Sequence, residues 1–476
     1  MTGMTVPLTL NPDRLFPAEQ STRAITRKLY QQVKDLPIIS PHGHVPPAWI
    51  ADDIPFSDPA SLLLTPDHYV NRVMHGQGVD LADLGVPVGS EFSADQARNA
   101  WRIFCKNWKL YRGTPMKYWM EMELVEIFGV DVTPSEETAD QIYDTIQSAI
   151  EKPEFKPRAL MDRFDIKFMA TTDDPCDDLA FHEKLANDAS FKRQVRPTFR
   201  PDKYLEPAKE AWNGLMDKLA EVSGENTDTF DGWIKAMENR RAYFKDHGAI
   251  SSDHSHADLG TEPLDKAEAD RLYERARQGK ITAEEGKALR QTFIFEQARM
   301  ASEDGLVMTM HPAVYRDYDE ATAERFGADV GSDAPTAVDV VHGLHAVLNA
   351  FGKNPNYRLV IFTMDETVYS RELGPLAGFY PSLYVGVPWW FIDAPDAIKR
   401  FRRAVTEYGT FYKTSGFIDD TRAFLSIPAR HDMSRRLDCV HLSELVAEHR
   451  LTMEEAEELA HELVVDIPTH VFSIPA

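Results

Sequence analysis

Cysteine is scarce in this sequence, and long apolar runs are missing. Only three cysteines occur in 476 residues, at positions 105, 176 and 439, and none of them forms a CxxC pair. This spacing supplies no disulfide framework, which fits a reducing compartment and leads us to expect a cytoplasmic protein. No apolar stretch approaches the ~18 residues that a membrane helix needs, and a signal-peptide pattern is absent. We therefore expect a soluble protein with no membrane partner.

Basic residues are also in deficit. Lys plus Arg number 52 against 76 Asp plus Glu, so the net charge is −24. Excess negative charge repels phosphate backbones, so we expect no nucleic-acid partner. A local arginine cluster can still reverse the field inside a cleft, and an anionic small-molecule substrate remains compatible with the composition. An acidic surface with many aromatic residues also permits a homo-oligomer, which we expect without a fixed number of subunits.

Glycine-rich phosphate loops are the third absence, and they would be typical of an open doubly wound sheet. The chain has instead eight short apolar runs, most of which end in ionisable or aromatic residues: 36–40, 165–170, 194–199, 248–251, 305–310, 358–363, 383–387 and 415–418. Helical patterns lie between several of them. Eight strands alternating with helices predict a (β/α)8 barrel, with its chemistry at the carboxyl ends of the strands. The open doubly wound sheet is the alternative fold.

Two of the helical patterns have clear end signals. Apolar residues from Phe230 to Phe244 share one face, and Gly248 closes that helix. A second pattern runs from Ala337 to Phe351, opened by Asp333 and Pro335 and closed by Gly352. Both lie between consecutive strands, as a βα repeat requires.

The predicted barrel carries helical additions. Residues 1–35 form an N-terminal arm and a helix, and 36–45 contain the first strand. An aromatic-rich helical insertion covers 46–163, and 164–440 supply the rest of the barrel with a second helical insertion at 264–303. Residues 441–476 form a C-terminal helical segment, in which Thr452 and Glu455 make a capping box.

The first strand ends in His42-Gly43-His44. Side chains alternate faces along a strand, so both histidines point the same way. Two imidazoles at a strand end can bind a divalent metal, or can hold and protonate a polar substrate. Because His-x-His is a short pattern, two ordinary loop histidines are the alternative interpretation.

Other strand ends supply residues that would meet this pair in one pocket. A histidine pair with Asp420 could hold one divalent ion, and arginine side chains could grip a carboxylate in a planar fork. The candidates are Arg200 after the third strand, His311 and Arg316 after the fifth, Trp390 after the seventh, and Asp420 and Arg422 after the eighth.

Each candidate also has an ordinary structural explanation. His311 could be a structural histidine, Trp390 part of the core, and Asp420 with Arg422 a salt-bridged pair. For the segments Asp173-Asp174-Pro175 and Asp253-His254, helix capping is the interpretation that we favour. Only the position of the candidates at the ends of different strands makes a shared site persuasive.

Eight motifs, in order along nearly the whole chain, carry a family resemblance. The sequence resembles uronate isomerase (glucuronate isomerase), an outlying family of the amidohydrolase superfamily. The motifs are His42-Gly43-His44-Val45-Pro46-Pro47, Asp67-His68-Tyr69, Thr171-Thr172-Asp173-Asp174-Pro175, Arg200-Pro201-Asp202, Ser252-Asp253-His254, Pro388-Trp389-Trp390-Phe391, Asp420-Thr421-Arg422 and Arg430-His431.

The resemblance implies a distorted (β/α)8 TIM barrel of the metallo-dependent hydrolase type. It implies an aldose–ketose isomerase of hexuronate catabolism that interconverts D-glucuronate with D-fructuronate and D-galacturonate with D-tagaturonate. It also implies a zinc ion on His42, His44 and Asp420, without settling whether turnover needs the metal. The implied catalytic residues are Asp420, Tyr69, His311 and Arg422, and the implied substrate-binding residues are Arg200, Arg316, Trp390 and His68.

The sequence departs from the family pattern in three places. The segment His311-Pro312-Ala313-Val314-Tyr315-Arg316 keeps the spacing to the arginine but places a proline directly after the histidine. Ser40-Pro41 precedes His42, where an acidic residue commonly stands two positions ahead. Asp419 adds a second carboxylate beside Asp420. We expect these changes to leave the fold intact and to affect substrate preference.

Aldose–ketose isomerisation moves a proton from C2 to C1 through an enediol, which requires a base and a stabilised oxyanion. We hypothesise that Asp420, assisted by Tyr69 or a metal-bound water, moves the protons, although a hydride shift stays open. A metal-dependent hydrolase is the first alternative, but it would want a lysine after the fourth strand and a histidine after the sixth. A non-catalytic sugar-acid-binding protein is the second.

Overall fold

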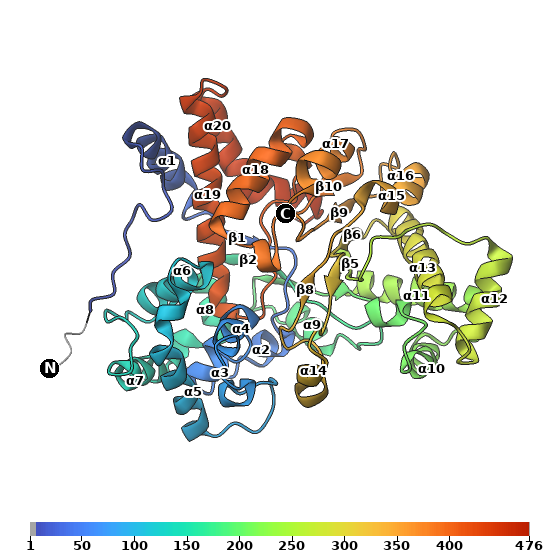
Figure 1. Ribbon diagram of the computed structural model, residues 1–476, viewed down its shortest axis with the longest axis horizontal. Helices are drawn as coiled ribbons and strands as arrows, with labels where there is room; N and C mark the ends of the chain where they lie inside the picture. Colours follow the sequence, from blue (N-terminus) through green and yellow to red (C-terminus); the bar gives the residue numbers. More distant parts are fainter. Residues whose placement is uncertain (1–5, 476) are drawn as a thin grey trace.

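Short parallel strands form most of a closed barrel in the computed structural model, which describes residues 6–475 (Figure 1). One sheet has the order β1-β2-β3 and the other the order β10-β9-β6-β5-β4, with all neighbours parallel. Pro197 separates β3 from β4 and cannot donate to a ladder, so these two form one interrupted strand. The strands are β1 (Ile38–Ser40), β2 (Ile166–Ala170), β3 (Gln194–Arg196), β4 (Thr198–Phe199), β5 (Ser251–His254), β6 (Val307–Met310), β9 (Leu359–Ile361) and β10 (Leu383–Val385).

The predicted eighth strand, 415–418, is wrong as a regular strand. Thr414 forms only an isolated parallel bridge with Val385. The reason lies at Gly416, which has a φ of +74° and would bring an added Cβ within 2.7 Å of Pro468. The chain therefore bends here, and the amide of His44 donates to the carbonyl of Thr421 at 3.0 Å to close the seam. The barrel prediction is confirmed, and this seam shows where the barrel is distorted.

The predicted helix from Ala337 to Phe351 is also divided. It consists of α15 (Val340–Gly343) and α16 (His345–Phe351), and Asp339 rather than Asp333 caps its start. The break follows Gly343, where an added Cβ would lie 2.1 Å from the carbonyl oxygen of Leu259. The earlier residues belong to β8 (Ala334–Pro335), which pairs antiparallel with β7 (Val314–Tyr315).

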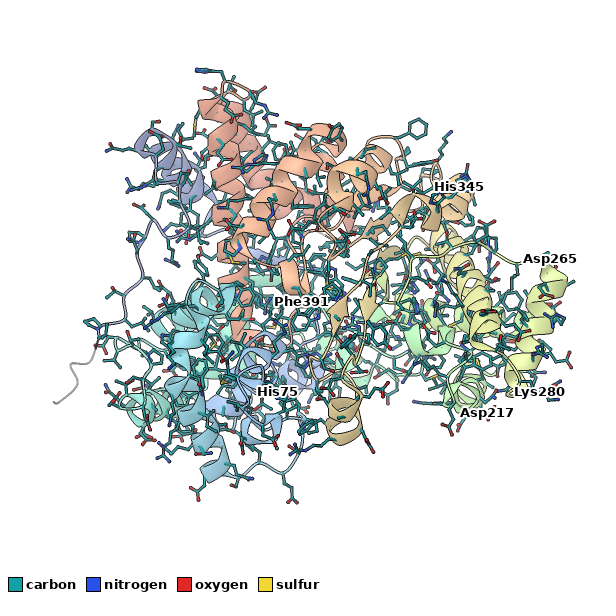
Figure 2. All side chains as sticks on the ribbon, viewed as in Figure 1. His75, Asp217, Asp265, Lys280, His345 and Phe391 are labelled. Atoms are coloured by element: carbon teal, nitrogen blue, oxygen red, sulfur yellow. The ribbon has the colours of Figure 1, made fainter. Side chains whose placement is uncertain are left out.

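Helices cover the outside of the barrel after β2 (Figure 1). The side chains of Asp217, Asp265 and Lys280 lie at the outer rim of this layer (Figure 2). The predicted insertion at 264–303 corresponds to α12 and α13. These covering helices are α9 (Ala180–Ala186), α10 (Trp212–Ser223), α11 (Phe230–Asp246), α12 (Lys266–Arg277), α13 (Ala283–Asp304), α17 (Gly374–Ala377) and α18 (Pro395–Gly409), whereas α14 (Glu320–Phe326) lies in the connection between β7 and β8.

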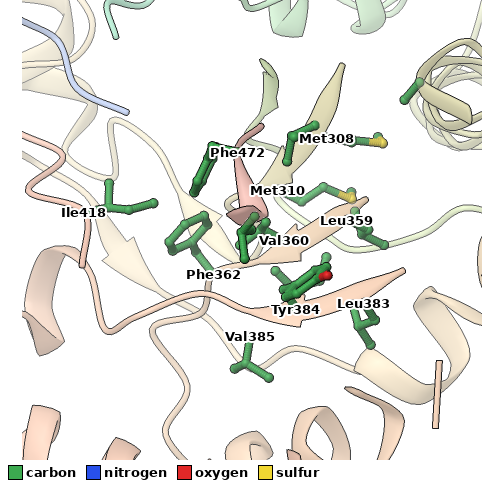
Figure 3. Close-up of a cluster of buried hydrophobic side chains, with 14 of the residues drawn as sticks. Met308, Met310, Leu359, Val360, Phe362, Leu383, Tyr384, Val385, Ile418 and Phe472 are labelled. Atoms are coloured by element: carbon green, nitrogen blue, oxygen red, sulfur yellow. The ribbon is translucent and has the colours of Figure 1, made fainter. Parts of the chain in front are cut away.

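Figure 3 shows how the strands and the C-terminal segment share one core. Side chains from β6, β9 and β10 lie together, and Ile418 and Phe472 pack among them. Leu359, Val360 and Leu383 are fully buried, which suits parallel strands covered on both faces. The C-terminal segment contributes α20 (Met453–His461) and α21 (Ile467–Val471), and the predicted capping box of Thr452 and Glu455 is present.

The predicted helical region between β1 and β2 forms a second hydrophobic core. It contains α2 (Pro47–Asp52), α3 (Pro59–Leu63), α4 (His68–His75), α5 (Ala94–Lys106), α6 (Pro115–Met122), α7 (Ala139–Ile150) and α8 (Pro157–Arg163). No helix in residues 6–475 is long and apolar enough to cross a membrane.

Helix α19 (Ile427–Ala447) joins the two cores, and α1 (Gln20–Val33) packs against it. Met433 and Leu437 belong to the core of the helical region, whereas Cys439 and Leu442 belong to that of the barrel. The boundary predicted between residues 440 and 441 therefore falls inside one continuous helix. The segment that carries Asp420 leads directly into α19, so both cores hold it in place.

Candidate active site

A cavity of about 980 Å³ opens at the carboxyl ends of the barrel strands. This is the position at which barrel enzymes carry their chemistry. Every site residue predicted from the sequence lines this cavity: His42, His44, His68, Tyr69, Arg200, His311, Arg316, Trp390, Asp420 and Arg422.

Asp420 lies between the two histidines that follow β1. Its Oδ1 atom is 2.9 Å from His44 Nε2 and 3.4 Å from His42 Nε2. Asp420 has a φ of +42°, a left-handed conformation that an aspartate adopts at a cost. The surroundings enforce this conformation, because the neighbouring Thr421 is bonded to the first strand through the amide of His44.

Asp253, near the end of β5, organises the opposite side of the histidine pair. Its Oδ1 accepts hydrogen bonds from Thr309 Oγ1 at 2.6 Å and from the Nδ1 atom of His311 at 2.7 Å. Its Oδ2 lies 3.3 Å from Arg200 Nη1 and 3.9 Å from His42 Nε2. The helix-capping interpretation of Asp253 is therefore wrong, because its carboxylate faces the strand ends rather than a helix terminus.

The buried charges of this cluster have shifted pKa values. Burial acts to raise the pKa of Asp420, but His42 and His44 hold it well below its ordinary value of 3.8. Burial acts to lower the pKa of His42, but Asp253 and Asp420 outweigh this and raise it. For His44, burial prevails over Asp420 and lowers the pKa to about 4. Asp420 is therefore a carboxylate at neutral pH, and His44 is a neutral ring.

Histidine and carboxylate atoms at this cluster are close enough to share one divalent ion. Ligand atoms of His42, His311 and Asp420 all lie within 4.8 Å of one another. Within residues 6–475, the buried Nε2 atom of His311 has no hydrogen-bond partner, so its lone pair could bind an ion. This group contains His311 in place of the predicted ligand His44, whose Nε2 is directed toward Asp420. We call His42, His44, His311 and Asp420 the β1 centre.

An aromatic wall faces the β1 centre. The rings of Tyr69 and Trp390 meet edge to face with centroids 4.5 Å apart, and His68 lies 6.4 Å from Trp390. Phe391 follows Trp390 in this wall and appears near the middle of the molecule (Figure 2). Aromatic faces of this kind can stack on the apolar face of a sugar ring and exclude water.

Arg430 supports this wall from behind. Its guanidinium lies 4.4 Å from the Tyr69 ring centroid and 3.8 Å from that of Trp119. It also donates to Asp393 Oδ2 at 2.9 Å, and all of these groups except Tyr69 are almost fully buried. The stacked cation fixes the position of the Tyr69 ring at the edge of the cavity.

The three candidate arginines have different partners. Arg200 contacts two carboxylates, since its Nε also donates to Asp202 Oδ2 at 2.8 Å. Arg316 donates to Asp333 Oδ2 at 2.8 Å, and Arg422 donates to Asp329. Both of the latter carboxylates come from the segment 328–333 at the cavity edge. An incoming anion therefore competes with fewer carboxylates at Arg316 and Arg422 than at Arg200.

Sequence reasoning missed these acidic partners. Asp333 also accepts from Trp390 Nε1 at 3.2 Å, so one carboxylate holds both the arginine and the aromatic wall. Asp329 and Asp333 lie in a polar loop whose pattern resembles any solvated turn, and no local signal marks them. Asp253 lies within β5, and the helix-capping interpretation left it outside the predicted site.

The departures at Asp419 and Pro312 have structural outcomes. Asp419 is buried outside the cavity lining, and its Oδ2 lies 3.1 Å from His431 Nε2. It therefore adds no second carboxylate to the site. After Pro312, Ala313 has a φ of +65° and its amide donates to the carbonyl of His256 at 3.1 Å. This turn directs Arg316 into the cavity.

Comparisons with known proteins identify relatives of this chain. A family model described as glucuronate isomerase matches residues 19–471. The chain is 58% identical over 470 residues to a uronate isomerase of Cutibacterium acnes, with 99% of this chain and all of that protein covered. It is 46% identical to a uronate isomerase of Rhizobium meliloti, covering 98% and 99% of the two chains.

Solved structures give the same result. The glucuronate isomerase of Caulobacter crescentus superposes with a TM-score of 0.96 at 41% identity, covering 99% of this chain and 98% of that one. The uronate isomerase of Thermotoga maritima has a TM-score of 0.90 at 28% identity, covering 98% and 99%. A putative metal-dependent hydrolase of Lactobacillus casei, at 16% identity and a TM-score of 0.54, shares the fold over 94% and 97% of the two chains.

Proposed function

Since this chain belongs to the glucuronate isomerase family and is an isomerase of uronates, we propose that its substrates are D-glucuronate and D-galacturonate. It would convert them into D-fructuronate and D-tagaturonate. The observation that carries this proposal is the β1 centre. There the ionised Asp420 contacts both His42 and His44, and arginine side chains line the same cavity. A carboxylate-bearing sugar fits both the chemistry and the charge of this site.

We propose that Asp420 carries the proton between C2 and C1 of the sugar. The contacts with His42 and His44 keep Asp420 in its basic form at neutral pH. Removing a proton from C2 leaves an enediolate, whose oxygens need hydrogen-bond donors. Burial raises the pKa of Tyr69 far above its ordinary range, so its hydroxyl keeps its proton and can donate to such an oxygen.

We propose that the implied divalent metal, expected to be zinc, is held by His42, His311 and Asp420. The orphaned Nε2 of His311 and the mutual distances within 4.8 Å support this fit. When bound, a divalent ion supplies Lewis-acid polarisation of the sugar oxygens. Asp420 cannot be both a tight ligand and a free base, so these two functions of its carboxylate compete. Asp253 orients His311 through Nδ1 in either case.

We propose that Arg422, with Arg316, binds the carboxylate of the uronate. The side chain of Arg422 is 34% exposed, has one carboxylate partner and extends from the segment that carries Asp420. A substrate carboxylate would replace Asp329 in this ion pair. Arg200 is instead held between Asp202 and Asp253, where it balances the charge of the site.

The alternatives are less compatible with these residues. A binuclear hydrolase would want a lysine after the fourth strand, where the chain has Asp253 and His254 at the end of β5. It would also want a histidine after the sixth strand, where Thr363, Met364 and Asp365 follow β9. A mere binding protein would not need the aligned carboxylate and histidines. The predicted homo-oligomer and the cytoplasmic location stay proposals, which size-exclusion chromatography with light scattering and cell fractionation would examine.

Proton NMR of the purified protein with D-glucuronate or D-galacturonate in D2O tests the proposal. We expect signals of the matching ketouronate and deuterium at C2 of the recovered aldose. Ketose without deuterium would preserve the isomerase and contradict exchangeable proton transfer by Asp420. No conversion of either sugar, with zinc supplied, would overturn the substrate assignment.

A further inference from the structure

A second His-x-His segment ends the strand β5, outside the catalytic cluster. It consists of His254, Ser255 and His256, and it faces Asp202, which follows β4. Ligand atoms of Asp202, His254 and His256 all lie within 4.8 Å of one another, and His256 Nε2 is 3.6 Å from Asp202 Oδ1. We call these three residues the β5 centre.

No contact in the described part of the chain explains why the buried residue 254 is a histidine rather than an apolar residue. Its side chain is 1% exposed, and within the described part of the chain neither ring nitrogen has a hydrogen-bond partner. Buried polar groups in native proteins are nearly always paired with protein, water or an ion.

His256 is oriented in the way that metal-binding histidines are oriented. Its Nδ1 lies 2.9 Å from Glu206 Oε1, and Glu206 is itself fixed by Arg290, which donates to Oε2 at 2.9 Å. A carboxylate on Nδ1 fixes the tautomer and directs the lone pair of Nε2 away from Glu206. That Nε2 atom is buried without a partner among residues 6–475 and faces Asp202.

Asp202 completes a set of two imidazoles and one carboxylate. Its Oδ1 accepts the amide of Ser255 at 3.0 Å, and its Oδ2 accepts Arg200 Nε at 2.8 Å. These contacts fix the carboxylate on the histidine pair and leave lone pairs on both oxygens. Asp202 and His256 line the same cavity as the β1 centre, which gives an ion a route from solvent.

We propose that the β5 centre is a second metal site, which binds a divalent transition ion of the zinc type. Two imidazole nitrogens and one carboxylate oxygen suit such ions, and the side open to the cavity leaves room for further ligands. Arg200 lies between this site and Asp253, so the two centres are neighbours with separate ligands. The proposal does not depend on the identity of the substrate.

Metal counting on matched variants tests the second site. The full-length protein is stripped with a chelator, returned to metal-free buffer and titrated with Co²⁺, whose visible absorption and elemental content report bound ions. Asp420→Asn removes a ligand of the β1 centre and serves as the background. We expect this variant to bind one Co²⁺ per chain, and the double variants that add His256→Gln or Asp202→Asn to bind none.

His441→Asn, also on the Asp420→Asn background, provides the matched control. His441 is likewise buried with both ring nitrogens unpartnered in the described residues, but it belongs to no group of metal-binding side chains there. We expect this control to keep the single Co²⁺. Circular dichroism verifies that each variant is folded, and the partly exposed Asp202 offers a substitution that folds even if a histidine variant does not.

The outcomes separate clearly. Loss of the remaining Co²⁺ in the His256→Gln or Asp202→Asn background, with retention in the His441→Asn control, supports the site. An Asp420→Asn protein that binds no Co²⁺ overturns it. Retention of Co²⁺ in a folded Asp420→Asn/His256→Gln/Asp202→Asn protein also overturns it, because the ion would then lie elsewhere.

Discussion

The strands β1 and β5 both end in His-x-His, but the surroundings give the two pairs different chemistry. At the β1 centre, Asp420 contacts both histidines, has a left-handed backbone and no arginine within hydrogen-bonding reach among the described residues. At the β5 centre, Asp202 is tied to Arg200 and to the backbone of Ser255. The first carboxylate is free to meet a substrate, whereas the second is fixed.

The difference shows that a histidine pattern does not by itself assign a function. What separates the two centres is the partner of the carboxylate, because the guanidinium of Arg200 occupies one oxygen of Asp202, whereas Asp420 contacts both histidines. Each centre still has a carboxylate that orients one histidine, Asp253 for His311 and Glu206 for His256. The two centres therefore share a carboxylate that orients a histidine ring. They differ in the other carboxylate, since Asp420 is proposed as a base and Asp202 is not.

The same carboxylate-to-amide change in both centres tests this contrast most strongly. We expect Asp420→Asn to lower kcat by about 10²–10⁴-fold, the usual contribution of a general base. Asp202→Asn should act mainly through KM and by about tenfold or less, because Arg200 keeps its contact with Asp253 at 3.3 Å. Steady-state kinetics on D-glucuronate distinguishes the two. Equal losses of kcat would remove the distinction between base and fixed carboxylate.

We expect the next largest effect at Arg422, at the rim of the β1 centre. Arg422→Lys keeps the charge but loses the planar fork, so we expect KM for the uronate to rise by about 10–100-fold. Arg98→Lys, on the surface beside Asp140 and Asp144, is the control and should leave KM nearly unchanged. A kinetic titration measures both. An unchanged KM in Arg422→Lys would mean that Arg316 or Arg200 binds the substrate carboxylate instead.

The two orienting carboxylates allow a comparison of metal affinity. Glu206→Gln should weaken Co²⁺ binding at the β5 centre by about 10–100-fold, and Asp253→Asn should do the same at the β1 centre. Competition with a metal indicator measures each affinity in the background that lacks the other centre. If one substitution weakened both centres equally, they would be one coupled site.

The smallest expected effect is a change of folding stability with pH, which arises from a buried carboxylate near each centre. Burial raises the pKa of Asp393 to about 7, although Arg430 opposes this. The folded state therefore binds this proton more tightly than the unfolded chain, whose aspartates titrate near ~4. The resulting stability is complete below pH ~4 and is lost as the pH rises through about 7, at up to ~1.4 kcal/mol per pH unit.

Thermal unfolding from pH 5 to pH 8 measures this effect. We expect the melting temperature of Asp393→Asn to depend less on pH than that of the native chain, whatever its absolute value. At the β5 centre, the contribution of Glu206 to folding stability changes with pH in the opposite direction. Burial acts to raise the pKa of Glu206, but His256 and Arg290 lower it, so its contribution is lost only as the pH falls below the ordinary value of 4.5. Parallel slopes in both proteins would contradict the shift at Asp393.

Much of this arrangement was predictable from strand ends. All ten site residues follow apolar runs or belong to motifs in the expected order, and strand alternation places His42 with His44. The start of β5 was not predictable, because the run at 248–251 suggested an earlier strand. Gly248 has a φ of +86° and packs against Arg196, so the chain is still turning there and the strand begins at Ser251.

The misplaced start of β5 explains why Asp253 and His254 were left out of the predicted site. With β5 placed three residues too early, Asp253 and His254 fell beyond the strand and were interpreted as caps. The carboxylates at 329 and 333 depend on the long connection after β6, whose path no local pattern specifies. The broken seam near Gly416 likewise arises from contact with Pro468 in the C-terminal segment. These features are set by contacts between distant segments, which sequence periodicity does not report.

The placement of Asp420 after the last barrel strand has a consequence during protein synthesis. His42 leaves the ribosome long before Asp420, by roughly 20–80 seconds at ordinary elongation rates. Asp202, His254 and His256 emerge within roughly 3–11 seconds of one another by the same rates. A nascent chain thus contains all three residues of the β5 centre while the β1 centre still lacks its carboxylate, and turnover cannot begin until the irregular segment that closes the barrel seam has been made.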